Sequence, residues 1–339
     1  METGLRPMNL GEILDRTAQL YRTNFVLFAG IFVIYSGVVL VLNLLALGVE
    51  ELLKSLHMAG ALLWVRLGSG LMELLVLFLL LGAAVAAICR AVAWVHLGER
   101  ATIRGAYQSI LPRLGRYLWL MTITAVAVWT PVALLYAGYF ATIVFYTKKL
   151  GTHAAAQSAA AAHPMAIAIV GVATVVFILL LIPVGAYTIW MGLRYALALP
   201  ACVVENLSAL KALRRGVELS KGSRGRIFVL GLLIGAIKLG LVLITQSFIF
   251  FAIFKHHGQA GAGLTILSQM ISFFTNTFLG PIYATGITLF YYDQRVRREG
   301  YDIEWMMQAA GLTAPAPPAA ASMTASEPAS EPAQSGEMA

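Results

Sequence analysis

The chain is 339 residues long, and 59% of its residues are hydrophobic whereas only 12% are charged. This balance, with a mean hydropathy of +0.79, excludes an ordinary soluble globular protein and predicts a membrane protein. The formal net charge of +8 favours anionic lipid headgroups as partners. Because the sequence carries no RNA-binding pattern, we do not expect it to bind nucleic acid.

Six apolar segments are long enough to cross a hydrocarbon core of about 30 Å, and in lipid such runs satisfy their backbone hydrogen bonds as helices. Glu73 and Arg90 interrupt one segment and Lys238 another, whereas the other four carry no charged residue. The sequence therefore predicts an all-α polytopic membrane protein with six transmembrane helices in three hairpins. The predicted spans are residues 25–47, 70–95, 118–146, 165–193, 227–254 and 263–292.

The Lys and Arg residues lie mainly on one side of these spans. With the N-terminus inside, only five of the 24 fall in outer loops and Lys238 falls within a span, which leaves eighteen inside. The positive-inside rule then predicts a multi-pass inner-membrane protein with cytoplasmic N- and C-termini. The outer cations are Lys54, Arg66, Lys148, Lys149 and Lys255.

A basic segment with apolar residues at helical spacing precedes each pair of spans, which predicts three cytoplasmic amphipathic helices at the membrane interface. The first begins with a capping-box pattern, Asn9 followed by Glu12. The second contains Pro112, which is expected to kink or end it. The third holds Lys211, Arg214, Arg215 and Lys221 opposite an apolar face.

This arrangement is interpreted as a threefold repeat with units near residues 9–98, 102–200 and 207–298, which together form a membrane domain over residues 1–305. The alternative is that basic segments entering any membrane helix look alike. Residues 306–339, rich in Ala, Pro, Ser and Glu, are expected to form a disordered cytoplasmic tail.

The basic segments are expected to form a collar that binds anionic lipid headgroups, because each cation near such a surface contributes about 1 kcal/mol. The candidate headgroup-binding residues are Arg16, Arg22, Arg104, Arg113, Arg116, Lys211, Arg214, Arg215 and Lys221.

Lys238 lies near the middle of a predicted span, where a lone cation costs roughly 3 kcal/mol on insertion scales. A functional hypothesis pairs it with Glu73 in a substrate- or proton-linked site. The alternative is a lysine whose apolar stem lets the ammonium reach the interface.

The last span carries a polar stripe, because Thr265, Gln269, Ser272 and Asn276 fall on one side of a helix. Such a stripe lines a cavity or joins two helices by polar contacts. Together with Lys238 and Glu73 it is the candidate intramembrane polar site.

The sequence contains no nucleotide-binding, serine-hydrolase or zinc-protease motif and no constellation of acid and base residues, so we expect no enzyme and no cofactor. His153, His163, His256 and His257 lie in predicted outer loops without carboxylate or cysteine partners at ligand spacing, so no metal site is predicted. Cys89 and Cys202 are expected to be free.

Three stretches of the chain have a recognisable pattern: Asn9 to Phe25 (NLGEILDRTAQLYRTNF), Leu199 to Ser220 (LPACVVENLSALKALRRGVELS) and Tyr291 to Gly300 (YYDQRVRREG). Together they resemble a bacterial family known as the glycerophosphoryl diester phosphodiesterase membrane domain. The resemblance covers residues 8–305 and implies a six-helix membrane module, which in some members is fused to a phosphodiesterase barrel. This chain lacks the His-Arg-Gly and acidic metal-ligand motifs of that barrel, so the resemblance implies no phosphodiesterase activity.

The sequence thus predicts a non-enzymatic membrane protein that organises or handles lipid or envelope components. The alternative function is a small-molecule or ion-coupled transporter built on Lys238, Glu73 and the polar stripe.

Overall fold

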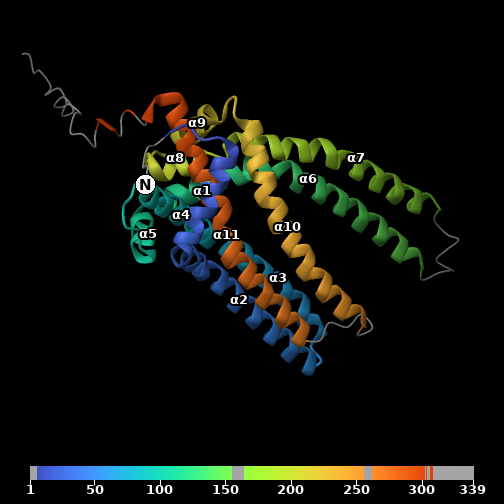
Figure 1. The fold of residues 1–339 in the computed structure, drawn as a ribbon. Helices are drawn as coiled ribbons and strands as arrows, with labels where there is room; N and C mark the ends of the chain where they lie inside the picture. Colours follow the sequence, from blue (N-terminus) through green and yellow to red (C-terminus); the bar gives the residue numbers. More distant parts are fainter. Residues whose placement is uncertain (1–5, 155–163, 256–261, 302, 304–305, 308–339) are drawn as a thin grey trace, which may run out of the picture.

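The computed structural model describes residues 6–154, 164–255, 262–301, 303, 306 and 307, and these residues are almost all helical, without a strand (Figure 1). The elements are α1 (Leu10–Thr23), α2 (Phe25–Ser55), α3 (Ala59–Val76), the π-helical turn η1 (Leu77–Leu81), α4 (Gly82–His96), α5 (Ile103–Ile110), the 3-10 turn η2 (Leu111–Arg113), α6 (Leu114–Ala154), α7 (Pro164–Tyr195), α8 (Ala198–Val204), α9 (Ala209–Ser220), α10 (Arg224–Lys255) and α11 (Ala262–Glu299).

Five helical segments in the described part of the chain are long and apolar enough to cross a membrane. They correspond to α2, the continuous run α3–η1–α4, α6, α7 and α10. The sixth predicted span lies within α11, which is 38 residues long but does not meet the same hydropathy criterion. Polar residues such as Gln269 and Asn276 lower its hydropathy. Five helices of the described residues could therefore span a membrane by length and composition, and the sixth span stays a prediction.

The short helices gather at one end of the molecule (Figure 1). There α1, α5, α8 and α9 surround α4 and the C-terminal part of α11, and we call this region the basic end. The long helices extend away from it. Helix α2 packs against α3 and α11, α10 packs against α11, and α6 packs along α7. The α6–α7 pair therefore projects from the basic end as a separate arm (Figure 1).

The three short helices that were predicted before the odd-numbered spans are present as α1, α5 and α9. Asn9 and Glu12 form the predicted capping box, in which Glu12 N–H donates to Asn9 Oδ1 at 2.8 Å and Asn9 N–H donates to Glu12 Oε2 at 2.7 Å. The hydrogen bond from the Asn9 backbone holds the pKa of Glu12 below its ordinary value. Thr102 caps α5 through Gly105 N–H, and the turn that holds Pro112 separates α5 from α6.

The core lies at the basic end and is centred on α4. Ala84, Ala86, Ala87 and Ala91 of α4 are fully buried, and these small side chains allow α2, α5, α6, α8 and α11 all to contact this one helix. Burial falls sharply along the arm. In the most apolar stretch of α2, 33% of the residues are buried inside the protein. The corresponding share is only 6% in α6, and no residue is buried in the most apolar stretch of α7. The arm is therefore stabilised by the α6–α7 contact and by the medium around it.

The predicted tail, residues 306–339, lies almost wholly outside the described residues, as do His163, His256 and His257. The side chain of His153 is likewise not described. Cys89 and Cys202 are both buried and free, as predicted.

Candidate functional site

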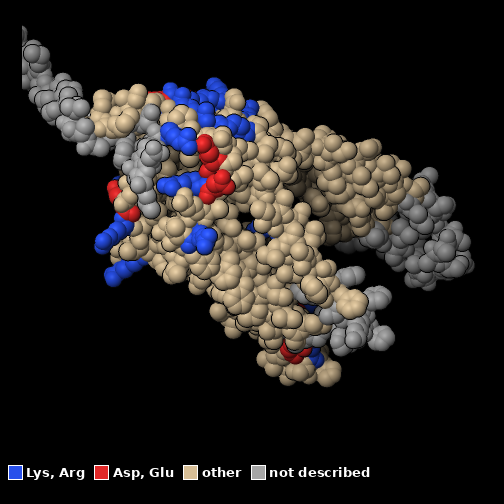
Figure 2. Space-filling view, in the orientation of Figure 1, with Lys and Arg blue, Asp and Glu red and all other residues tan. Residues whose placement is uncertain are grey.

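Exposed cations concentrate at the basic end, over α9 and its neighbours (Figure 2). Most of the predicted headgroup-binding side chains are exposed there, and these form no ion pair with a carboxylate within the described residues. These exposed cations are Arg16, Arg22, Arg104, Arg113, Lys211, Arg214 and Lys221. These side chains are exposed as the predicted collar requires, and their binding of lipid headgroups stays a prediction.

Arg116 belongs to the same predicted set but serves the fold. Its guanidinium donates to the carbonyl oxygen of Asn206 at 2.8 Å, to Asn206 Oδ1 at 3.0 Å and to the carbonyl oxygen of Leu207 at 3.2 Å. Asn206 has a φ of 58°, a left-handed conformation that Asn tolerates better than most residues. Arg116 thus fixes the sharp turn between α8 and α9.

Arg215 is likewise engaged inside the protein. Its Nε lies 3.0 Å from Glu205 and its Nη2 lies 2.5 Å from Glu299. Tyr291 donates to Glu205 Oε1 at 2.6 Å. Burial opposes the charged form of Arg215, but the two carboxylates outweigh it, and the pKa of Arg215 is raised. Arg215 therefore joins α9 to α11 and is not available to a lipid.

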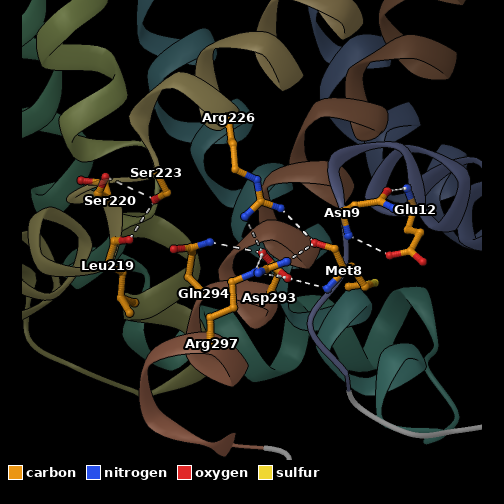
Figure 3. A network of polar contacts seen from close by, with 10 residues as sticks. All are labelled: Met8, Asn9, Glu12, Leu219, Ser220, Ser223, Arg226, Asp293, Gln294 and Arg297. Carbon is orange, nitrogen blue, oxygen red and sulfur yellow. Dashed lines mark hydrogen bonds and ion pairs between the residues drawn. The ribbon is translucent and has the colours of Figure 1, made fainter.

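Asp293 is the centre of a second polar network, which joins α11 to α10 and to the segment before α1 (Figure 3). Its side chain is 0% exposed and accepts from the Met8 N–H at 2.7 Å, from Arg297 at 3.0 Å and from Arg226 at 3.3 Å. Gln294 adds a donor at 3.2 Å. Arg226 and Arg297 also both donate to the Met8 carbonyl oxygen. Asp293 was not among the predicted site residues. The signal that could have found it is the three arginines that follow it in α11, Arg295, Arg297 and Arg298.

These two networks pair three acids of the basic end, Glu205, Glu299 and Asp293, with four arginines inside the protein. Asp15, Glu99 and Glu218 remain exposed at the same end. The positive charge of the surface therefore comes from the larger number of exposed Lys and Arg side chains.

The structure does not bring Lys238 to Glu73. Lys238 lies in α10 and Glu73 in α3, both side chains are exposed on the surface of the chain, and neither forms an ion pair or hydrogen bond within the described residues. Glu73 lines a space of about 270 Å³ between α2 and α3, beside Asn43 and Ser69. The predicted pair is therefore not formed, and the alternative, in which the Lys238 stem lets its ammonium reach the interface, stays a prediction.

Replacing Lys238 with Met is expected to leave the free energy of unfolding unchanged or to raise it by up to about 1 kcal/mol, because no partner is lost and a cation leaves an apolar surface. Thermal unfolding in detergent would measure this. In the double variant with Glu73→Gln, the two effects should add to within about 0.5 kcal/mol. A coupling larger than 1 kcal/mol would show that the two charges interact after all.

The polar stripe of α11 faces α2. Gln269, Ser272 and Asn276 line a space of about 20 Å³ together with Tyr35 and Ser36. That volume is close to the minimum for a single water molecule. Next to it, the Ser36 and Thr277 hydroxyls are hydrogen-bonded at 2.5 Å in a buried site. Thr265 lies in α11 outside this lining. Three of the four stripe residues thus face α2 across a space too small for a substrate, an arrangement that favours the predicted role in helix contact over a cavity.

A larger groove of about 470 Å³ separates α3 and α4 from α6 and α7. Its lining is almost entirely apolar, and its Thr124 hydroxyl is satisfied by the Leu120 carbonyl oxygen at 3.0 Å. Gly82 lets α4 approach α6, since a Cβ there would lie 2.8 Å from Met121 Sδ. The π-helical turn η1 also lines the groove, and such turns are frequent at functional sites. Sequence reasoning missed this groove because it depends on how four helices meet.

Comparisons with known proteins give no guide to this geometry. The chain matches no protein-family model, and no curated protein or solved structure matches it significantly. The resemblance of its opening, middle and closing motifs to a membrane-domain family therefore stays a prediction. The function must therefore be inferred from the structure of this chain, in which long apolar helices meet at a positively charged end.

Proposed function

We propose that this is a six-span protein of a bacterial inner membrane whose basic end lies in the cytoplasm and binds the anionic headgroups of the inner leaflet. Helix α11 supplies the sixth span. At 1.5 Å per residue it is long enough to cross, and its polar stripe is turned toward α2 and not toward lipid. The excess of Lys and Arg at the basic end supports the orientation.

One observation carries the proposal of lipid binding. Three acids of the basic end, Glu205, Glu299 and Asp293, are engaged in internal ion pairs. Lys211, Arg214 and Lys221 are instead exposed on or beside one helix, α9, and form no ion pair within the described residues. An unneutralised positive surface next to apolar spans matches the inner leaflet, where headgroups are anionic. The protein would thereby organise or handle lipid or envelope components, as a non-enzymatic membrane module of the kind that the resemblance implies.

The transporter alternative has weaker support. It depended on a polar site formed by Lys238, Glu73 and the α11 stripe, and these groups lie apart. The groove of about 470 Å³ beside α4 and α6 is apolar, which suits a hydrocarbon chain better than an ion. Lipid is therefore the favoured ligand.

Replacing Lys211, Arg214 and Lys221 together with Gln is expected to abolish most of the preference for anionic lipid, since each cation contributes about 1 kcal/mol near such a surface. The measurement is the selectivity of spin-labelled phosphatidylglycerol over phosphatidylcholine for the full-length protein in nanodiscs. High salt should weaken the wild-type preference in the same direction.

Lys54→Gln is the matched control. Lys54 lies near the far end of α2 and is ion-paired with Glu51 at 2.6 Å, so its loss should leave the selectivity unchanged. If the triple variant keeps the wild-type preference at low salt, the positive surface does not select the lipids and the proposal fails.

A further inference from the structure

Half-buried arginines at the basic end fall into two groups. In the first, each guanidinium has polar partners within the protein, as described for Arg116, Arg215 and Arg226. In the second, the guanidinium forms no hydrogen bond or ion pair within the described residues, and its Nε is buried without a partner. The members of this second group are Arg90, Arg194 and Arg224.

Two members of the second group meet at one aromatic ring. Arg194 ends α7, Arg224 begins α10, and these two helices are in contact. The Cζ atoms of Arg194 and Arg224 lie 5.5 Å and 5.7 Å from the centre of the Trp190 ring. Both are within the range of a cation–π interaction. Trp190 itself is 46% exposed, so the site opens to the surroundings of the protein.

The arrangement leaves positive charge without compensation. Two guanidinium groups next to one ring repel each other, and no carboxylate pairs with either within the described residues. A buried N–H without an acceptor adds a desolvation penalty. The first residue of α10 also lies at a helix N-terminus, where the backbone favours negative charge. An anion bound by both guanidinium groups would compensate their charge.

We propose that Arg194, Arg224 and Trp190 bind the phosphate of a single phospholipid from the inner leaflet. Arginine matches phosphate oxygens with two parallel hydrogen bonds, and tryptophan is favoured at the headgroup level of a membrane. This inference rests on the proposed lipid-binding function and names one site for it.

The surroundings of the site explain why the phosphate belongs to a lipid. The Cζ of Arg194 lies 5.8 Å from the centre of the Tyr195 ring, and Tyr195 is also part of the lining of the apolar groove. One residue thus borders both the cationic site and a groove of about 470 Å³, a size within the range of ligand pockets. A lipid with its phosphate at the arginines would place an acyl chain against this apolar lining.

The test is retention of lipid by the full-length protein. The protein is reconstituted with phosphatidylglycerol, extracted in mild detergent and examined by native mass spectrometry. We expect the wild type to keep one phospholipid, and Arg194→Gln with Arg224→Gln to reduce its retention by about 10- to 100-fold, the loss expected for hydrogen bonds to a charged group. Equal retention by a folded double variant would overturn the site.

A second variant tests the site if the first variant does not fold. Arg194→Lys with Arg224→Lys keeps both charges but loses the planar groups that stack on Trp190 and bind phosphate in pairs, so we expect a smaller fall in retention of about 10-fold. Retention equal to that of the wild type in this variant would also count against the site.

Two further measurements distinguish this site from the collar and a bound lipid from free phosphate. The collar variant at Lys211, Arg214 and Lys221 should keep the bound lipid even where it loses selectivity in nanodiscs. If the collar variant loses selectivity but the Arg194 and Arg224 variant retains its lipid, the proposed function stands and this site is wrong. Inorganic phosphate at millimolar concentration should not displace the lipid. Displacement would show that the site binds the free anion instead.

Discussion

Replacing Asp293 with Asn is expected to lower the free energy of unfolding by about 2–4 kcal/mol. Removing one member of a buried ion pair costs about 3–5 kcal/mol. The loss expected here is smaller because the side chains of Arg226 and Arg297 are 33% and 37% exposed, and solvent screens their charges. The variant keeps the size of the side chain but leaves both arginines without their carboxylate. Thermal unfolding of the purified protein in detergent would measure the loss.

Asp15→Asn is the control for this experiment. Asp15 is exposed on α1 and has no partner within the described residues, so its replacement should change the free energy of unfolding by less than about 0.5 kcal/mol. Adding Arg297→Gln to Asp293→Asn should cost less than the sum of the two single changes, because they belong to one network. Equal effects of Asp293→Asn and Asp15→Asn would mean that the network does not stabilise the protein.

Replacing Gly216 with Ala is expected to destabilise the contact between α8 and α9 by about 1–3 kcal/mol. A Cβ at this position would lie 2.7 Å from both the Cα and the N of Ala198. These are backbone atoms, which cannot turn aside as the end of a side chain can. The cost should outweigh the gain of about 0.5–1 kcal/mol that alanine brings to a helix.

The same substitution at Gly225 should have the opposite sign. Gly225 lies in the first turn of α10, and a Cβ there meets nothing within 4 Å, so only the gain in helix stability remains. Comparing the two variants by thermal unfolding separates packing from helix propensity. A stabilising Gly216→Ala would show that α8 can move away from α9 at little cost.

The helices were predictable because their signals are local. A run of about 20 apolar residues predicts a span wherever it occurs, and the Asn9–Glu12 capping box lies within four residues of sequence. The position of Pro112 likewise marked the break between α5 and α6. Each of these features depends on neighbours along the chain, which the sequence displays directly.

The candidate site was less predictable because its partners are distant in sequence. Arg116 and Arg215 look like other basic residues of the collar, and only the positions of Asn206 and Glu205 show that they are internal. Helix α8 was missed because it is short and contains Pro200. The pairing of Arg194 with Arg224 depends on the approach of α7 to α10, which no periodicity in either helix reveals.

The bond between the Met8 N–H and Asp293 joins residues 285 positions apart, and this separation has a consequence for biosynthesis. A ribosome adds about 5–20 residues per second, so the start of α1 waits roughly 15–60 s before its partner in α11 has been made. During that interval the earlier helices have already left the ribosome, and the buried face of α1 lacks the helix that covers it. Completion of the basic end is therefore a late step, taken only after the last helix has emerged.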